Sequence, residues 1–494
     1  MWTKALDIFL QAYSNTDIEI ININYNNVRP EGERLKTFGG RASGHRPLKL
    51  MFEEIEDRIK NTLDGVIDPV TAMDIMNSIA KAIVVGGVRR SSQIVFGDVD
   101  DTKYIDAKKN LFFDSTKAKY KSTRVLSNNS IHLWQKPSWN KLVSIFDTIK
   151  NNGEPGLYIA ENAAKRRPNY KGSNPCGEVL LDSNGVCNLT TTNLVNFVLS
   201  DGNWDKDKLF RVTKLSVRMG SRITLVDMWD KEWDYIQKRD RLLGVSLTGI
   251  VDAYNLLNDE AKKDFPNLIK QLKEISREEA DKYHDELGIP RSLLVTTNKP
   301  EGSLSQLPTV SSGIHAPYSP YYYRRVRVSK TDPVSKALLD LGLKAVPEND
   351  QGDDINSDKC NTLVFTIPIK TSASIRAIDE SAIEQLERYK LFITNYVEHT
   401  VSVTITVADD EWDDVTQWVW DNWEYCIGIA FLPRFDPSEA DSPYPNMPYE
   451  SITKKQYYDI ELDEDKFIEL ISKYEMEHEE HELEYDCKTG CPVR

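Results

Sequence analysis

The chain has 494 residues, of which 40% are hydrophobic and 28% charged, and its formal net charge is −15. This composition predicts a folded protein with a sizeable core and excludes a largely disordered chain. The acidic balance argues against nucleic acid as a partner, because a phosphate-backbone binder needs a concentrated basic patch and the basic clusters here are short. An anionic small substrate is not excluded, since a few well-placed donors can hold it.

No segment reaches the apolar length of a membrane span, and the first residues lack a signal-peptide cleavage site. We therefore expect a cytoplasmic protein with no membrane partner. The six cysteines are too few and too scattered for a secreted disulfide scaffold. In a reducing compartment, those that matter should be catalytic, redox-active or metal-bound.

The predicted elements alternate along the chain. Residues 2–13 have helical spacing without a preceding cap, the glycine-rich stretch 27–44 predicts a loop near a site, and Asp68 before Pro69 predicts a helix start. Further helices are predicted over 142–150, 267–287 and 381–399, a strand turning into a helix over 242–257, and strands over 93–96, 361–369 and 400–408. This alternation predicts an α/β architecture with a largely parallel sheet, followed by a mobile acidic tail.

Two cysteines, Cys360 and Cys426, are expected to be small core residues, which is the commonest role of an isolated cysteine. One C-x3-C pair without a second close pair falls short of a structural zinc site, and the stretch "EHEEHE" is explained equally well as a solvated charged face. No metal site is therefore expected.

Cys176 is different because Pro175 and Gly177 mark a tight turn, which can present its side chain to a cavity. Asn174 and Glu178 bring an amide and a carboxylate to the same place. A carboxylate whose pKa is raised by desolvation can act as a general base. The stretch thus indicates proton transfer beside a sulfur reaction.

Several motifs, in order and over nearly the whole chain, resemble the ribonucleotide reductases, and among them the monomeric adenosylcobalamin-dependent (class II) ribonucleoside-triphosphate reductases. The motifs are "RPEGERLKTFGGRASG", "VGGVRRSSQIVFGD", "VLSNNSIHLW", "SNPCGEVLL" with "CNLT", "RLLGVSLTGIVDA", "NKPEGSLSQLPTVSSGIH", "RRVRVSKTDP", "HTVSVTI" and "DCKTGCPVR". The resemblance implies the family's ten-stranded α/β barrel with a central finger loop, of which residues 1–475 would form a partial barrel that lacks the first strand or strands, and a flexible redox tail over 476–494. It implies adenosylcobalamin as cofactor, without naming the residues that contact it.

The resemblance also implies roles for single residues. Cys176 would be the thiyl radical that abstracts the 3′ hydrogen of the ribose, Glu178 would take the 3′-hydroxyl proton, and Asn174 would bind the ribose hydroxyls. Cys187 would be one of the two thiols that reduce the substrate radical.

Cys487 and Cys491 would be the tail pair that re-reduces the active site and receives electrons from thioredoxin. This agrees with the chemistry, because a reaction that delivers two electrons to a substrate needs a dithiol and a route for re-reducing it. An ordinary disordered end is the alternative.

The stretch "KPEGSLSQL" offers a glycine for close backbone approach and hydroxyls near a helix start, which suits a triphosphate. The resemblance places the substrate phosphates here, usually with serine or threonine where this chain has Glu301, so either that side chain points away or the contact is altered. A capped turn without a ligand is the alternative. The implied substrate-binding residues are Ser173, Gly302, Ser303, Leu304 and Ser305.

The family's first barrel strand and the partner of Cys187 lie in a segment that has no counterpart before "MWTKALDIF". We therefore expect a fragment, half of a split reductase completed by an N-terminal chain, or a shortened enzyme with another thiol, for which Cys360 is the only candidate. A non-catalytic barrel scaffold and a reductase with a separate metal radical subunit are the rival functions. The run Tyr321–Tyr323 is expected to pack in a cleft wall rather than relay a radical.

Overall fold

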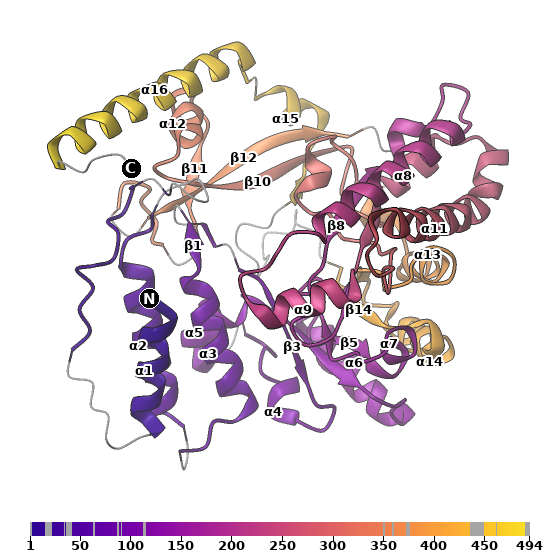
Figure 1. Cartoon of the computed structure of the whole chain (residues 1–494), viewed down its shortest axis with the longest axis horizontal. Helices are drawn as coiled ribbons and strands as arrows, with labels where there is room; N and C mark the ends of the chain where they lie inside the picture. The colour runs from indigo at the N-terminus through magenta and orange to yellow at the C-terminus, as the bar shows by residue number, and fades with distance from the viewer. Residues whose placement is uncertain are drawn as a thin grey trace.

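The structure is a computed structural model that describes residues 2–14, 22–33, 35, 42–62, 65–85, 88–89, 91–111, 115–348, 351–357, 360–371, 376–434, 449–460 and 462–489. Three parts can be followed in Figure 1: a group of N-terminal helices, a curved sheet wrapped by helices, and an antiparallel sheet carrying the C-terminal helices.

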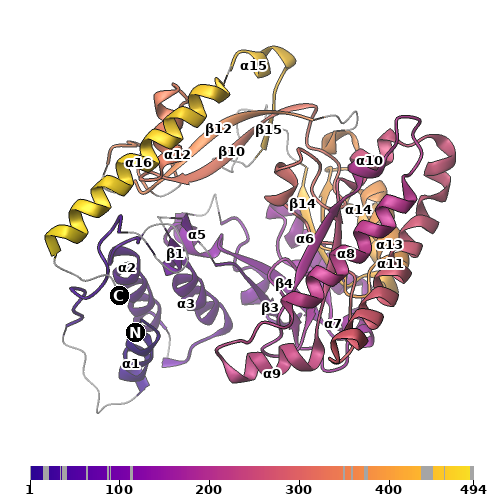
Figure 2. The same cartoon turned by 45° about the horizontal axis from the view of Figure 1, so that its top comes forward.

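The N-terminal helices stand side by side (Figure 2). They are α1 (Trp2–Ser14), α2 (Arg46–Lys60), α3 (Pro69–Ala82) and α5 (Ala118–Arg124). Phe9, Phe52 and Ile55 are buried in the core that they share. The helix start predicted at Asp68 is confirmed, because its side chain accepts a hydrogen bond from the Thr71 N–H at 2.8 Å. The glycine-rich stretch 27–44 lies only partly within the described residues.

One half of the curved sheet has the strand order β13-β14-β5-β4-β3. Its strands are β3 (Gln93–Gly97), β4 (Ser127–Leu133), β5 (Gly156–Ile159), β13 (Thr404–Val407) and β14 (Gly428–Pro433). β3, β4 and β5 are parallel, β13 is parallel to β14, and β14 is antiparallel to β5. The fully buried pattern of β5 explains why its sequence is apolar without alternation.

The other half begins with the parallel pair β8 (Leu189–Asn193) and β9 (Gly244–Thr248). Bridges from Val245 to Thr296 and from Asn298 to Val401 join β9 to the segment leading into β13. The two halves therefore form one curved sheet around a central space.

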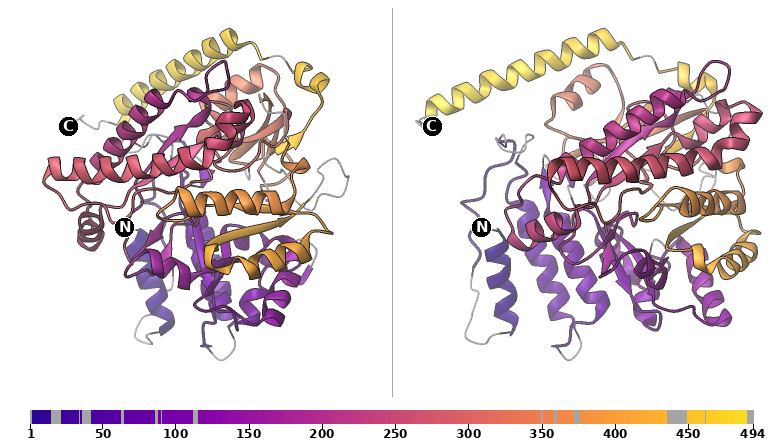
Figure 3. Two further views of the ribbon diagram at one scale, coloured as in Figure 1. Left: turned by 90° about the vertical axis from the view of Figure 1, so that its right-hand side faces the viewer. Right: turned by 45° about the vertical axis from the view of Figure 1, so that its right-hand side comes forward.

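Helices cover the outside of this sheet (Figure 3). They are α6 (Trp139–Asn152), α8 (Lys206–Ile223), α10 (Ile250–Leu256), α11 (Asp259–Leu287), α13 (Ala382–Asn395) and α14 (Trp412–Asp421). The helices predicted over 142–150, 267–287 and 381–399 and the strand-to-helix turn over 242–257 are confirmed, but α11 begins two turns before residue 267 and α13 ends before residue 396. Their apolar faces make up the main hydrophobic core with the strands.

The central space holds a short hairpin, β6 (Gly172–Ser173) and β7 (Leu180–Leu181), paired antiparallel. The loop at its end carries the sequence that was predicted to be reactive.

A second sheet lies above the barrel with the order β11-β12-β10-β15. Its strands are β10 (Tyr321–Ser329), β11 (Ala345–Pro347), β12 (Thr362–Lys370) and β15 (Tyr449–Ser451), and its helices are α12 (Pro333–Asp340), α15 (Lys454–Tyr458) and α16 (Glu464–Thr489). All its pairs are antiparallel. The expectation of a largely parallel sheet therefore does not extend here, because nine residues of β10 pair directly with nine of β12 as in a hairpin.

Among the described residues, no helix is both long and apolar enough to cross a membrane. The remaining elements are short. They are β1 (Val84–Val85), β2 (Val88–Arg89), α4 (Thr102–Ile105), α7 (Ala160–Arg166), α9 (Lys231–Asp240) and the 3-10 turns Ser115–Lys117, Leu194–Phe197, Leu304–Gln306, Ala377–Asp379 and Trp423–Tyr425.

Candidate active site

The loop between β6 and β7 is a tight finger closed by Asn174. The Asn174 Oδ1 accepts a hydrogen bond from the Val179 N–H at 2.8 Å, and the Asn174 carbonyl accepts one from the Gly177 N–H at 2.8 Å. Gly177 has φ +83°, a backbone conformation that favours glycine. The chain therefore turns sharply and leaves Cys176 exposed at the tip.

Both halves of the curved sheet hold this finger. Tyr158 of β5 donates its hydroxyl to the Gly177 carbonyl at 3.1 Å. From the other half, the Thr297 hydroxyl and the Thr400 N–H donate to the Glu178 carbonyl at 2.7 and 3.2 Å. The backbone that follows Cys176 is therefore held from both halves of the sheet, as a reactive group that must meet its substrate in one geometry requires.

His399 ties the base of the finger to the barrel. Its Nδ1 accepts a hydrogen bond from the Leu180 N–H at 3.2 Å, and its Nε2 donates to the Leu243 carbonyl at 2.9 Å. The side chain is completely buried, and burial lowers its pKa to about 3. It therefore stays neutral and holds one tautomer.

The Cys176 thiol is held in its protonated form. Although the tip of the finger is exposed, the surrounding protein partly desolvates the thiol. This desolvation and the carboxylate of Glu178 raise its pKa to about 11, and Lys299 opposes this shift only in part. A nucleophilic cysteine needs the opposite shift, toward the thiolate. The site therefore suits loss of a hydrogen atom from the thiol better than nucleophilic attack by a thiolate.

Glu178 is a buried carboxylate without a hydrogen-bond partner for either oxygen among the described residues. Burial raises its pKa, while the nearby amide of Asn174 and the charge of Lys299 partly oppose the shift. A buried carboxylate that is only partly compensated costs folding free energy, so its presence indicates a group that is completed by a ligand.

Cys187 lies in the same electrostatic environment, just before β8. Burial and Glu178 raise its pKa, and its charge in turn contributes to the raised pKa of Cys176. Both thiols are free in the structure. The structure thus brings together three residues predicted from the sequence, Cys176, Glu178 and Cys187.

Glu301 turns into the protein. Its side chain is 1% exposed and accepts a hydrogen bond from the hydroxyl of Thr191. Gly302 and Ser303 beside it are exposed. Of the two alternatives for this departure from the family pattern, the structure supports a side chain that points away from the exposed loop.

The rest of this loop is split between surface and core. Leu304 is exposed, whereas Ser305 is buried and its hydroxyl contacts that of Ser312 at 3.1 Å. Tyr322 of β10 donates its hydroxyl to Gln306 at 3.2 Å, which ties the antiparallel sheet to the loop. Ser173, at the start of the finger, donates its hydroxyl to the neighbouring carbonyl of Asn174 at 3.0 Å.

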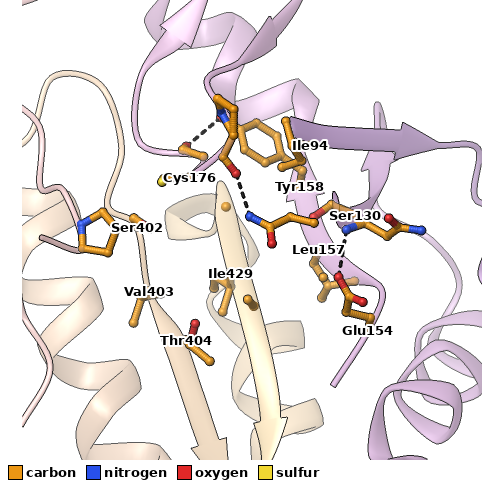
Figure 4. Close-up of a pocket in the computed structure, with 18 of the residues that line it drawn as sticks. Ile94, Ser130, Glu154, Leu157, Tyr158, Cys176, Ser402, Val403, Thr404 and Ile429 are labelled. Carbon is orange, nitrogen blue, oxygen red and sulfur yellow. Dashed lines mark hydrogen bonds between the residues drawn. The ribbon is translucent and has the colours of Figure 1, made fainter. Parts of the chain in front are cut away.

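A cavity of about 240 Å³ opens beside Cys176. Figure 4 shows Cys176 above it, with Tyr158 and Ile94 on one side and Ser402, Val403 and Thr404 on the other. Asn128 also lines it and donates to the Pro175 carbonyl at 2.7 Å. The cavity can receive a small organic group next to the sulfur.

The remaining cysteines lie elsewhere. Cys360 and Cys426 are buried in apolar cores, as predicted, and Cys360 belongs to the core of the antiparallel sheet together with Leu363 and Phe365. Cys487 lies in the last turn of α16, but its side chain is outside the described part of the chain, as is the whole of Cys491. The packing predicted for the tyrosine run is confirmed for Tyr322, which is 4% exposed.

Sequence reasoning missed four residues that build the site: Tyr158, Thr297, Lys299 and His399. The last two stand inside quoted motifs, and their signal was a polar residue within an otherwise apolar or turn-forming stretch. Among the described residues, no group of three or more His, Cys, Asp or Glu side chains is placed to bind a metal. The stretch 477–482 lies outside the described side chains.

The sequence profile of the family "Ribonucleotide reductase, barrel domain" matches residues 139–262. The probable adenosylcobalamin-dependent ribonucleoside-triphosphate reductase of Dictyostelium discoideum is 28% identical over 476 residues, covering 93% of this chain and 59% of that protein. The adenosylcobalamin-dependent ribonucleoside-triphosphate reductase of Lactobacillus acidophilus is 29% identical over 517 residues, covering 96% of this chain and 66% of that protein. This chain therefore spans less than two thirds of each relative.

A crystal structure of a B-12 dependent (class II) ribonucleotide reductase matches with a TM-score of 0.69 and 25% identity, covering 90% of this chain and 63% of the other. Residues 139–262 therefore match the barrel domain of the ribonucleotide reductases, and the fold of the chain is similar to that of a class II reductase, as the sequence motifs predicted. The sequence is similar to the adenosylcobalamin-dependent reductases over most of its length.

Proposed function

We propose that this chain forms the catalytic barrel of an adenosylcobalamin-dependent ribonucleoside-triphosphate reductase, which reduces ribonucleotides to 2′-deoxyribonucleotides for DNA synthesis. One observation carries the proposal: the buried, unpartnered carboxylate of Glu178 stands two residues from the protonated thiol of Cys176. A hydrogen-atom donor beside a base of raised pKa is what radical removal of the ribose 2′-hydroxyl needs. The names of the relatives support the substrate and cofactor classes.

In the proposed reaction, the Cys176 thiyl takes the 3′ hydrogen, Glu178 accepts the 3′-hydroxyl proton, and the 2′-hydroxyl takes a proton from one of two thiols, one of which is Cys187, and leaves as water. The two thiols then deliver two electrons and their second proton to the substrate, so that a hydrogen replaces the hydroxyl at C2′. Glu178 returns its proton to the 3′ oxygen, and the 3′ hydrogen returns from Cys176. The thiols end as a disulfide. Asn174 is proposed to bind the ribose hydroxyls with its remaining side-chain N–H groups.

The cavity beside Cys176 fits the adenosyl part of the cofactor. Gly156 and Gly428 line it, and a Cβ at either would come within 3.0 Å of a neighbouring side chain, so any larger residue there would displace the wall of the cavity. Asn128 and Glu154 provide amide and carboxylate groups for sugar hydroxyls and a base. When bound, adenosylcobalamin supplies the hydrogen-atom acceptor that converts the Cys176 thiol into a thiyl radical.

The substrate phosphates are proposed to lie over the exposed backbone at Gly302 and Ser303, with Ser173, Leu304 and Ser305 shaping the same region. Burial of the Glu301 side chain supports this placement, because it keeps a negative charge away from the loop surface. Lys299, on the same loop, adds a positive charge.

Re-reduction is proposed to use Cys487 and Cys491 with thioredoxin in the cytoplasm. Among the cysteines with described side chains, only Cys187 stands near Cys176, and Cys360 lies in a separate core. A second reducing thiol must therefore come from outside these residues, and we propose a complementing chain that carries it. A metal radical subunit is not favoured, because the relatives are named for adenosylcobalamin.

Deoxynucleotide formation from a ribonucleoside triphosphate, with adenosylcobalamin and a small dithiol, tests the proposal. The assay is run with and without a chain supplying the remaining third of a class II relative. We expect activity in the completed enzyme, its loss in Cys176→Ser, and its retention in the matched control Cys426→Ser. Turnover by Cys176→Ser would contradict the thiyl assignment, and no turnover in any combination would contradict the function. Full turnover without the added chain would contradict the need for a complementing chain.

A further inference from the structure

Five aromatic rings form a continuous cluster from the finger to the surface. Tyr158, under the finger, is 1% exposed and lines the cavity of Cys176 (Figure 4). Its ring is parallel to that of Tyr170, with centroids 6.2 Å apart. Trp134 follows at 6.2 Å from Tyr170 and is 57% exposed. Phe96 and His132 fill the space between these rings.

The hydroxyls of this cluster are arranged for moving protons together with electrons. Tyr170 shares a hydrogen bond of 2.9 Å with the Nε2 of His132. Burial lowers the pKa of His132 to about 4, so the imidazole is neutral and can exchange a proton with the phenol. The hydroxyls of Tyr158 and Tyr170 are close enough that each shifts the pKa of the other, and the two rings lie parallel.

We propose that Tyr158, Tyr170 and Trp134 form a relay that carries the oxidising equivalent of a thiyl radical left without substrate out to the protein surface. The inference rests on the proposed thiyl chemistry at Cys176. Packing alone would be served equally by phenylalanine at the tyrosine positions. A packing role explains neither the hydrogen bond of Tyr170 to the neutral imidazole of His132 nor the exposure of Trp134.

Each step of the relay balances. The Cys176 thiyl takes a hydrogen atom from the Tyr158 hydroxyl, and the Tyr158 radical takes one from Tyr170. Tyr170 is restored by an electron from Trp134 and a proton from the medium through His132, while the indole proton of Trp134 leaves to water. A small reductant such as ascorbate then returns a hydrogen atom to Trp134. The net change is one thiyl reduced to a thiol and one reductant molecule oxidised.

The exchange between thiyl and phenol is close to thermoneutral, because cysteine S–H and tyrosine O–H bonds are similar in strength. Reduction of the Trp134 radical at the surface removes the last product of the relay and so drives the preceding transfers toward completion. In the structure the Tyr158 hydroxyl donates to the Gly177 carbonyl, so it must leave that bond before it meets the sulfur. A substrate held at Cys176 therefore reacts first, and the relay acts on radicals that persist.

The test makes the thiyl without cofactor or substrate. The full chain, with Cys187→Ala, Cys487→Ser and Cys491→Ser, is S-nitrosated at Cys176, and light breaks the S–N bond to give the thiyl and nitric oxide. We expect electron paramagnetic resonance to show a tyrosyl signal that changes when ring-deuterated tyrosine is incorporated and disappears with ascorbate.

Tyr158→Phe should abolish the signal, and Tyr170→Phe, which leaves the finger's hydrogen bond intact, should confine it to Tyr158 and slow its quenching by ascorbate. Trp134→Phe should slow quenching as well. The matched control is Tyr396→Phe, a buried tyrosine outside the cluster whose hydroxyl also donates to a backbone carbonyl. Absence of a tyrosyl signal in the parent, or quenching unchanged in Tyr170→Phe and Trp134→Phe, would overturn the relay. Because deoxynucleotide formation is assayed separately, failure of the proposed function is distinguishable from failure of the relay.

Discussion

The ammonium of Lys299 lies 4.0 Å from the Oε2 of Glu301, and this cation acts on the whole site. It lowers the pKa values of Cys176, Cys187 and Glu178, each of which burial raises. Glu301 acts in the opposite direction on Cys176 and Glu178. The protonation state of the site is therefore set by two adjacent residues of opposite charge on one loop.

Replacing Lys299 should shift the pH dependence of turnover. In Lys299→Met the pKa of Glu178 rises further, so the base stays protonated to higher pH and the acid limb of the kcat profile shifts to higher pH. Glu301→Gln should shift the same limb to lower pH. Lys270→Met, an exposed lysine on α11, is the matched control. Identical profiles for the two loop variants would contradict this electrostatic account.

Glu178→Gln should separate activity from stability. Loss of the base is expected to lower kcat by about 10²–10⁴-fold. The folded state holds the proton of Glu178 more tightly than the unfolded state, so the parent loses stability as pH rises from 4.5 through the raised pKa. The variant lacks this loss and should unfold at higher urea concentration at neutral pH. Equal or lower stability there would show that the carboxylate is compensated in the fold.

His399→Ala should destabilise the fold, because it leaves the Leu180 N–H and the Leu243 carbonyl unpaired in the core. The free energy of unfolding, measured with urea, should fall by about 2–5 kcal/mol. The control variant His45→Ala, at an exposed position, should change it little. In the parent protein the pKa of His399 is lowered from 6.5 to about 3. The neutral imidazole therefore contributes fully to the free energy of unfolding above pH 6.5, and this contribution is lost as the pH falls toward 3. The variant should show a weaker decline over that range.

The sequence predicted several helices, the strands β3, β9, β12 and β13, and the reactive finger, because these depend on local signals. The helix cap at Asp68 and the turn around Cys176 are each encoded by a few adjacent residues. The direction of β10 against β12 was not predictable in this way, because their pairing joins residues about forty positions apart and is decided by packing.

The same distinction applies to the site. Cys176 and Glu178 were predicted together because the finger places them side by side. Thr297 and His399 come from segments more than a hundred residues away, and only closure of the curved sheet brings them to the Glu178 carbonyl and the Leu180 N–H. Tyr158 was missed because a tyrosine in an apolar strand gives no signal of a hydroxyl aimed at a distant loop.

The reactivity of Cys176 should report its raised pKa directly. Alkylation by iodoacetamide is expected to accelerate toward pH 11 rather than near 9, because only the thiolate reacts. Glu178→Gln should move this profile to lower pH, since Glu178 is the largest charged contribution to the shift. Glu424→Gln, a carboxylate exposed on the outer surface, should leave it unchanged. A profile centred near 9 in the parent would contradict a protonated resting thiol.

The last prediction concerns the C-terminal cysteines. The first half of α16 is held to α12, where the Tyr474 hydroxyl donates to Asp340, so Cys487 lies on a helix whose beginning is fixed to the antiparallel sheet. A tail pair that passes electrons from thioredoxin should be dispensable when a small dithiol can enter the cleft. We therefore expect Cys487→Ser/Cys491→Ser to lose thioredoxin-driven deoxynucleotide formation in the completed enzyme and to keep dithiol-driven formation, while Cys360→Ser keeps both. Loss of both activities in the double variant would assign these cysteines a structural role, because a reductant that bypasses the tail would then fail for a reason other than electron supply.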